Sequence, residues 1–250
     1  MIDSENFFHL LKKNNIEYFL GVPDSLQKDF CNFIDDNVSE ENHIITANEG
    51  TAISLAAGIF LGSKKLSLVY LQNSGLGNSI NPLTSLVDKE VYKIPLLLMV
   101  GWRGEPGTLD EPQHSKTGKI TKQLLEELGI STFILDSNTD LKKMIDNVFY
   151  NISKKSEPTA ILVRKNTFAE YAYKRSNSNV SSMNRYDALK KIIECLNGEE
   201  SYFISTTGIT SRELFTLRKL KNEGHQHDFL TVGSMGHASS IALGIHLTNK

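Results

Sequence analysis

The chain is poor in cysteine, in net charge and in long apolar runs. Its two cysteines, Cys31 and Cys195, lie far apart without Cys-x-x-Cys spacing, so neither a zinc site nor a disulfide framework is indicated. The formal net charge of −2 argues against nucleic acid or a membrane surface as a partner. No apolar run approaches the roughly 18 residues of a membrane-spanning helix. The acidic start, residues 1–5, argues against a signal peptide, and we expect a cytoplasmic protein.

What the sequence does contain is a regular alternation of strand and helix patterns. At 250 residues the chain suffices for one large or two modest α/β domains. Strands separated by helical segments of about ten residues or more imply right-handed βαβ units and hence an α/β fold with a doubly wound parallel sheet. The expected strands are 16–20, 43–47, 66–72, 95–100, 131–135, 159–164, 202–205 and 228–232. The expected helices are one capped by Ser4, one after residue 25, and 50–61, 78–87, 118–128, 139–153, 185–196, 210–220 and 237–247.

A polar stretch from about residue 166 to residue 184, with serine and asparagine concentrated in 176–179 and 181–182, separates the last 66 residues from the rest. We therefore expect a first domain over 1–170, a linker over 171–184 and a second unit over 185–250. The second unit, with about 65 residues and two strands, is thin for an independent α/β domain, and we expect it to be a truncated one.

Glu49 lies where a β-branched apolar run meets a helix rich in small residues. This placement predicts a carboxylate at the carboxyl end of a strand, which is where open α/β sheets bind ligands. The alternative is an ordinary acidic residue in the first turn of a helix. In that helix, Ala52, Leu55, Ala56 and Ile59 recur with little bulk, which suggests close packing against another surface, such as the same helix of a second subunit.

Two further segments follow predicted strands. In segment 21–25, Asp24 or Ser25 can cap the next helix, or this helix start can hold a substrate anion. Segment 72–78 contains amides and glycines that allow a ligand to approach the backbone closely. It lacks the third glycine of the dinucleotide fingerprint, so a nucleotide-binding dehydrogenase is a poor alternative.

The long loop 101–114 gathers Arg103, Glu111 and His114 after another predicted strand. Loops of this length are often functional. Arg103 can pair with a phosphonate, sulfonate or carboxylate, and His114 can transfer protons near neutral pH. A loop-bracing arginine and a surface histidine are the alternatives.

In the second unit, segments 205–213 and 233–244 show the same strand-to-helix pattern. The first is rich in hydroxyl groups and suits a phosphate, although Thr206, Thr207 or Thr210 can equally act as helix caps. In the second segment, His237 is either a helix-start residue or a catalytic one. No cluster of His, Cys, Asp or Glu has metal-ligand spacing, so no metal site is predicted within the sequence.

Taken together, segments 21–25, 48–52, 72–78, 101–105, 111–114 and 233–237 resemble the thiamine-diphosphate-dependent phosphonopyruvate and sulfopyruvate decarboxylase family. The resemblance runs along the whole chain. It implies that 1–170 is a pyrimidine-binding domain and that 185–250 is the start of a diphosphate-binding domain. It also implies a homo-oligomer with the active site between subunits, in which Glu49 acts across an interface.

The resemblance also implies roles for individual residues. Glu49 would hydrogen-bond the cofactor pyrimidine and favour its imino tautomer, which gives the ylide. His114 would transfer protons, and Asp24, Ser25 and Arg103 would bind the substrate. The implied cofactor-binding residues are Glu49, Gln72, Asn73, Gly75, Asn78, Thr206, Thr207, Gly208, Gly236 and His237.

The implied reaction is decarboxylation of 3-phosphonopyruvate, a small 2-keto acid, to phosphonoacetaldehyde and carbon dioxide, in phosphonate biosynthesis. The Gly-Asp-Gly motif that binds Mg²⁺ and the cofactor diphosphate is absent, and we expect it beyond residue 250. Two alternatives remain open: decarboxylation of sulfopyruvate, and a non-catalytic fragment that lacks the metal and diphosphate motif.

Overall fold

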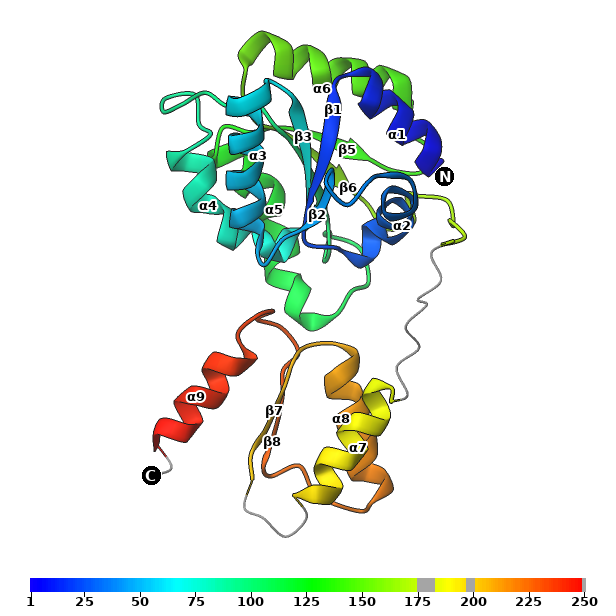
Figure 1. The fold of residues 1–250 in the computed structure, drawn as a ribbon, viewed down its shortest axis with the longest axis vertical. Coiled ribbons are helices and arrows are strands. Elements are labelled where there is room, and N and C mark those ends of the chain that lie inside the picture. Colours follow the sequence, from blue (N-terminus) through cyan, green and yellow to red (C-terminus); the bar gives the residue numbers. More distant parts are fainter. Residues whose placement is uncertain (175–182, 197–200, 249–250) are drawn as a thin grey trace. The chain divides into compact units, whose positions relative to one another are not determined.

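The computed structural model describes residues 1–174, 183–196 and 201–248. Contacts divide the chain into two compact units, Met1–Arg175 and Ser176–Lys250 (Figure 1). Residues 175–182 of the expected linker lie outside the described residues. The two units are considered separately below.

The first unit is built on a parallel sheet with the strand order β2-β1-β3-β4-β6-β5. Every neighbouring pair in this sheet is parallel. The strands are β1 (Ile16–Gly21), β2 (His43–Ile45), β3 (Leu66–Gln72), β4 (Leu97–Gly101), β5 (Ser131–Leu135) and β6 (Thr159–Val163). The predicted α/β fold with a doubly wound parallel sheet is confirmed.

Helices cover both faces of the sheet, as expected for parallel strands joined by crossover helices (Figure 1). Along β3, Leu68 and Tyr70 enter one core while Val69 and Leu71 enter the other, because successive side chains of a strand point to opposite faces. The first core contains α1 (Ser4–Lys13), α2 (Lys28–Asn37) and α6 (Leu141–Lys155). The second contains α3 (Glu49–Ser63), α4 (Leu76–Ser85) and α5 (Ser115–Glu127).

The order of the strands places a ligand crevice at one edge of this sheet. β1 pairs with β2 on one side and with β3 on the other, so the chain changes direction across the sheet at β1. In open α/β sheets such a switch point leaves a crevice beyond the carboxyl ends of the strands. Asp24 and Glu49 lie in the segments after β1 and β2, and Gln72 is the last residue of β3.

The expected cap of α1 was wrong, and the small residues of α3 pack closely as expected. Asp3, not Ser4, caps α1: the Asp3 backbone is extended, and its carboxylate accepts the Asn6 N–H at 2.8 Å. Ser4 is already helical and buried, so it cannot be the cap. In α3, Ala52 and Ala56 pack closely in the core against the unit's own sheet, with Leu55 and Ile59 partly buried beside them, while packing of this helix against a second subunit stays a prediction.

Three short 3-10 turns precede helices of the first unit: η1 (Ser25–Gln27), η2 (Asn73–Gly75) and η3 (Pro112–His114). Each lies at the carboxyl edge of the sheet, since η1 follows β1, η2 follows β3 and η3 ends the loop after β4. All three contain residues proposed above as site residues.

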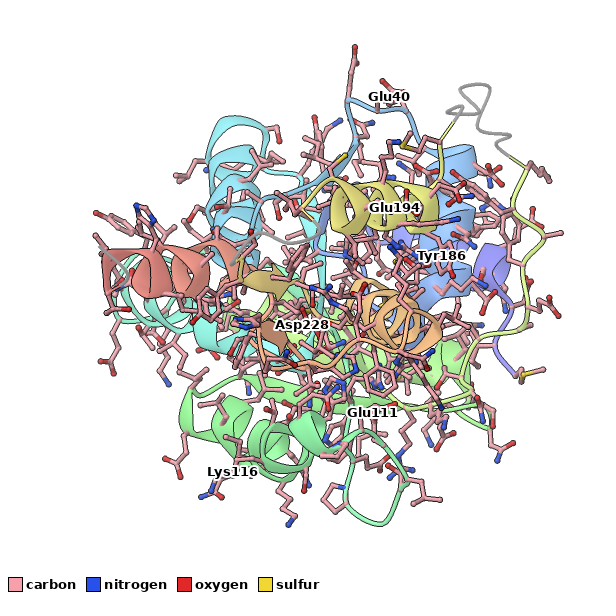
Figure 2. The ribbon with its side chains drawn as sticks, turned by 90° about the horizontal axis from the view of Figure 1, so that it is seen from below. Glu40, Glu111, Lys116, Tyr186, Glu194 and Asp228 are labelled. Atoms are coloured by element: carbon pink, nitrogen blue, oxygen red, sulfur yellow. The ribbon has the colours of Figure 1, made fainter. Side chains whose placement is uncertain are left out.

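The second unit contains a short parallel pair, β7 (Phe203–Ser205) and β8 (Asp228–Leu230). Its helices are α7 (Arg185–Cys195), α8 (Ile209–Leu220) and α9 (Ala238–Thr248). Tyr186 and Glu194 lie on α7, and Asp228 lies on β8 (Figure 2). The Asp228 carboxylate is fully buried and pairs with both Arg218 Nε and Nη2, at 3.2 and 3.1 Å, which ties β8 to α8.

Among the described residues, no helix is long and apolar enough to cross a membrane. The same part of the chain holds no group of His, Cys, Asp and Glu that could bind a metal ion. Both cysteines are free, and burial raises the pKa of the Cys31 thiol to about 12, so Cys31 is not a nucleophile at neutral pH.

Candidate functional site

Glu49 is the first residue of α3 and is only 4% exposed. The helix begins there because Asn48 is a good cap, and Asn48 Oδ1 accepts the Thr51 N–H at 3.0 Å. A carboxylate in the first turn is favoured by the helix dipole. The dipole does not explain the burial, because a carboxylate removed from water needs partners or a ligand.

The contacts of Glu49 leave one of its oxygens available. Asn78 Nδ2 donates to Glu49 Oε2 at 2.8 Å. Within the described ranges, no group donates a hydrogen bond to Oε1. The Glu49 side chain lies against Gly75, where an added Cβ would collide with Oε1. Gly75 therefore forms a cradle that any other residue would fill, and Oε1 can accept a hydrogen bond from a ligand.

Asp24 is the second buried carboxylate of this edge, at 4% exposed. It caps η1 by accepting the Leu26 N–H at 2.6 Å, and it also accepts a hydrogen bond from Gln72 Nε2 at 2.8 Å. A Cβ on Gly101 would lie 2.5 Å from Asp24 Oδ2, so β4 approaches the carboxylate closely. Burial raises the pKa of Asp24, and the hydrogen bonds from Gln72 and Leu26 oppose that rise.

Asn73 holds the backbone of Arg103 in place. Its side chain donates to Arg103 O at 2.8 Å and accepts from Arg103 N at 3.2 Å. Asn73 Nδ2 also donates to Thr121 Oγ1 of α5 at 2.8 Å. Asn73 is 1% exposed. Its polar side-chain atoms are thus used inside the protein, and they fix the point where the loop after β4 begins.

The Arg103 guanidinium is held by Asp110 and Ser25. Its Nε donates to Asp110 Oδ2 at 2.8 Å, its Nη2 bonds Asp110 Oδ1, and its Nη1 donates to Ser25 Oγ at 2.9 Å. The hydrogen bonds with Asp110 raise the pKa of Arg103 and hold that of Asp110 well below its usual range. Arg103 does brace its loop, and it lies beside the predicted substrate residue Ser25.

His114 ends the loop on η3 and is half-buried. Its carbonyl lies against Gly104, where an added Cβ would collide with it. Burial, followed by the positive charge of Arg103, lowers the pKa of the His114 imidazole below 6.5. His114 is therefore mainly neutral at pH 7. Glu111 and Lys116 flank η3 on either side (Figure 2).

The predicted residues of the second unit lie after β7 and before α9. Thr207 Oγ1 donates to Val232 O at 2.7 Å, which joins the ends of β7 and β8. Gly208, with φ 88°, caps α8 without a side chain, so the alternative of a threonine cap was wrong. Gly236 has φ 84°, and His237 Nδ1 lies 3.0 Å from Met235 O just before α9 begins.

The sequence did not single out three residues at this edge of the first unit. Asp110 is the main partner of Arg103, and Lys165 follows β6. Gln27 is fully buried and its Nε2 donates to Leu71 O and Met99 O, at 3.3 and 3.0 Å, which ties β3 to β4. Lys165 could have been found by its place after a strand, whereas Gln27 and Asp110 have no local signal.

Comparison of the sequence with known proteins identifies the family of this chain. Residues 4–127 match the thiamine pyrophosphate enzyme, N-terminal TPP binding domain. The chain is 33% identical over 221 residues to a phosphonopyruvate decarboxylase of Streptomyces viridochromogenes, covering 82% of this chain and 53% of that protein. It is 33% identical over 162 residues to sulfopyruvate decarboxylase subunit alpha of Methanococcus maripaludis, covering 64% of this chain and 93% of that subunit. The chain belongs to the phosphonopyruvate and sulfopyruvate decarboxylase family.

Coverage of other family members is partial. Against the phosphonopyruvate decarboxylase of Streptomyces hygroscopicus the identity is 31% over 264 residues, covering 99% of this chain and 63% of that protein. The chain thus spans 53% to 63% of the length of the two phosphonopyruvate decarboxylases. Family membership establishes an N-terminal thiamine-diphosphate-binding domain, and the residue roles stay predictions.

The first unit fits the pyrimidine end of thiamine diphosphate. A protonated ring nitrogen can donate a hydrogen bond to a carboxylate, and Glu49 offers Oε1 beside the cradle at Gly75. Asn78 fixes the other oxygen of that carboxylate. Within the first unit, Glu49, Gly75 and Asn78 are the residues that would hold the group.

Proposed function

We propose that this chain serves in the decarboxylation of 3-phosphonopyruvate to phosphonoacetaldehyde and carbon dioxide with thiamine diphosphate. The observation that carries the proposal is the buried Glu49 carboxylate, which is fixed on one side by Asn78 and available on the other. The similarity to phosphonopyruvate decarboxylases over most of the chain supports the choice of substrate.

Thiamine diphosphate, when bound, supplies an electron sink for the carbon that loses carbon dioxide. In this proposal Glu49 Oε1 accepts a hydrogen bond from the pyrimidine ring and makes the adjoining amino group basic. Asn78 keeps the carboxylate oriented, and Gly75 lets the carboxylate lie against the η2 backbone. Gln72, the last residue of β3, holds Asp24 through its side-chain hydrogen bond.

In this proposal the remaining side chains at this edge of the sheet transfer protons or bind the substrate. Burial raises the Asp24 pKa, so Asp24 holds a proton more readily than an exposed aspartate, and in this proposal it binds the substrate together with Ser25. His114, mainly neutral at pH 7, can accept a proton and is the proton-transferring residue of this proposal. Ser25 and Arg103 bind the anionic end of the substrate. Because the side-chain amide of Asn73 is hydrogen-bonded to the Arg103 backbone, we propose that Asn73 positions Arg103.

The second unit contributes the diphosphate side in this proposal. Thr206, Thr207, Gly208, Gly236 and His237 follow strand ends, where backbone N–H groups favour anions. Residues 1–170 are then the pyrimidine-binding domain and residues 185–250 belong to the diphosphate-binding domain. The proposal also includes Mg²⁺ as the counter-ion of the diphosphate and a homo-oligomeric assembly. It further includes a cytoplasmic location and a place in phosphonate biosynthesis.

Sulfopyruvate is the second candidate substrate, because the chain covers nearly all of a sulfopyruvate decarboxylase alpha subunit. The choice between the two substrates is tested by measuring carbon dioxide release and aldehyde formation from each acid, with thiamine diphosphate and Mg²⁺ present. We expect turnover of 3-phosphonopyruvate to exceed that of 3-sulfopyruvate. Equal turnover would remove the preference, and release from neither acid would overturn the proposal.

A further inference from the structure

A cavity of about 450 Å³ opens in the first unit at the carboxyl edge of the sheet. Its charged and hydroxyl-bearing lining comes from the segments that follow β1, β4 and β6. Cavities of a few hundred Å³ are the usual size of small-ligand sites. These lining residues are Ser25, Asp29, Arg103, Asp110, Lys165 and Glu170.

Arg103 lines this cavity, and each of its three guanidinium nitrogens already bonds a group of the protein itself. Asp110 takes Nε and Nη2 in a bidentate pair, and Ser25 takes Nη1. The two charged side chains keep only 19% and 15% of their surface exposed. Bidentate pairing with a carboxylate is the geometry that guanidinium groups also use for phosphonates and phosphates. Asp110 therefore occupies the place that a ligand anion would take.

Lys165 supplies a second cation to the same cavity. It is exposed, and within residues 1–174, 183–196 and 201–248 its ammonium has no ion-pair partner. Its neighbour Arg164 is different, since it pairs with Glu105 at 2.7 Å and with Asp136 at 3.4 Å. The free ammonium is thus a property of Lys165 and not of the segment as a whole.

The segment that carries Lys165 is firmly held. Thr167 Oγ1 donates to Arg164 O at 2.8 Å and to Leu135 O at 3.2 Å. The backbone of Ile2 bonds Thr167 and Ala169 on either side of Phe168, each at 2.8 Å. Lys165 is therefore presented from a fixed backbone, although its long side chain can move to meet a ligand.

The carboxylates of the cavity do not all compete for these cations. Asp29 Oδ1 accepts the Tyr171 N–H at 3.1 Å, so it belongs to the packing of the chain. Glu170 is exposed and solvated. Asp110 also accepts the N–H groups of Gly104 and Glu111, at 2.7 and 2.8 Å, so it can stay bound to its loop when Arg103 is taken over by another anion.

We propose that this cavity receives the anionic tail of the substrate, a phosphonate or sulfonate, and that the tail replaces Asp110 on Arg103 while Lys165 binds it as the second cation of the same cavity. This inference rests on the proposed function. It adds Lys165 as a residue that selects for the tail and Asp110 as the carboxylate that the tail displaces. Ser25 is next to Asp24 in the chain, which connects the tail site to the buried carboxylate.

The exchange has a clear electrostatic sense. A phosphonate dianion carries more charge and more acceptor oxygens than the Asp110 carboxylate, so it can bond Arg103 and Lys165 together. A monocarboxylate without a tail cannot do both. The site should therefore discriminate tailed from untailed 2-keto acids chiefly through Lys165.

Calorimetric titration of the full chain with phosphonoacetate tests the tail site, which is the cavity lined by Arg103 and Lys165. This measurement does not require catalysis. We expect Lys165→Met to weaken binding on the order of tenfold, the size expected for a lost charge-assisted hydrogen bond. Lys142→Met, a change of an exposed lysine on α6, is the matched control and should leave the affinity unchanged. Asp110→Asn should instead tighten binding, because a neutral amide competes less for Arg103. Circular dichroism of each variant verifies that it is folded.

Unchanged affinity in Lys165→Met, or weaker binding in Asp110→Asn, would overturn the inference. Turnover separates this inference from the function. If phosphonopyruvate is decarboxylated and Lys165→Met leaves its kcat/KM relative to that of pyruvate unchanged, the tail site is wrong and the function stands. If phosphonoacetate binds as predicted but no carbon dioxide is released from phosphonopyruvate, the tail site stands and the function is wrong.

Discussion

Asp24 and Glu49 are carboxylates that the fold buries at a cost. Each is 4% exposed, and each is pressed against a glycine of a neighbouring strand or turn. A core built for stability alone would avoid buried carboxylates, because taking a charged group out of water is unfavourable. Residues that lower stability in this way are commonly retained for activity.

For Asp24 the cost has a definite pH dependence. Because the folded-state pKa is raised above its ordinary 3.8, the folded protein binds the Asp24 proton more tightly than the unfolded chain does. This contribution to stability is present at acid pH and is lost as the pH rises from 3.8 through the folded-state pKa. We therefore predict that the melting temperature of Asp24→Asn, relative to wild type, increases between pH 4 and pH 7.

Thermal melts of both proteins across that pH range are the measurement. Asp146→Asn, a change of an exposed aspartate on α6, is the control and should show a difference that does not vary with pH. A difference between Asp24→Asn and wild type that is constant or decreases with pH would contradict the account.

The sequence predicts some residues of the site better than others. Asp24, Glu49 and Arg103 could be placed because each follows a strand pattern, and the carboxyl ends of parallel strands meet at one edge. The Arg103–Asp110 pair joins residues within one loop, and Gln27 bonds carbonyls on two strands 44 and 72 positions away. Such partners depend on the folded geometry and leave no local pattern.

At the scale of elements, the start of α3 and the turn before α4 form one unit around Glu49. Gly75 lies against the Glu49 side chain, and a Cβ on Gly50 would lie 2.6 Å from Asn78 O. Asn78 bonds the Glu49 carboxylate from the first turn of α4. Any added bulk in this contact must move Glu49.

Gly75→Ala should therefore displace the Glu49 carboxylate and weaken binding of thiamine diphosphate with Mg²⁺ by about tenfold or more, since one charge-assisted hydrogen bond is at stake. Gly77 is the matched control, because nothing lies within 4 Å of the position of its Cβ. Gly77→Ala should keep the affinity and gain up to about 1 kcal/mol of stability from helix propensity. Fluorescence titration measures the affinity, and equal affinity in the two variants would exclude the cradle.

The loop after β4 is a second element-scale feature. Asn73→Ala would remove both side-chain hydrogen bonds to the Arg103 backbone and leave the Arg103 N–H only its 3.1 Å bond to Gly101 O, so we predict a loss of about 1–3 kcal/mol in the free energy of unfolding. We also expect a higher KM for the substrate, because Arg103 would no longer be fixed. Denaturant unfolding and steady-state kinetics measure the two effects. Asn81→Ala, at an exposed position of α4, is the control, and an equal effect in both would contradict the positioning role.

The elements themselves were largely predictable. The expected strands 66–72 and 131–135 match β3 and β5 in both bounds. Short apolar runs between turn residues are typical of buried strands. The starts of α4 and α5 were predicted two or three residues late, because the 3-10 turns η2 and η3 lead into them. The predicted strand 43–47 is shorter in the structure, where β2 is His43–Ile45. Residues 46 and 47 instead lead to Asn48, the cap of α3.

At the scale of the whole molecule, the two units carry different shares of the proposed chemistry. The first holds Glu49 and the substrate residues, and the second holds the hydroxyls and glycines after β7 and β8. We predict that the full chain binds thiamine diphosphate with Mg²⁺ saturably and that Glu49→Gln weakens this binding. Calorimetric titration of both proteins tests this, and no saturable binding would favour the alternative of a non-catalytic fragment.

The most direct test of the account is the rate of carbon dioxide release from 3-phosphonopyruvate by wild type and Glu49→Gln, with thiamine diphosphate and Mg²⁺ at saturation. The amide keeps the shape of the side chain but removes the negative charge that Oε1 offers. The account predicts a loss of about 10²- to 10⁴-fold, the range for a group that assists proton transfer. Glu41→Gln, at an exposed position, should retain the wild-type rate. A near-normal rate in Glu49→Gln would contradict the account.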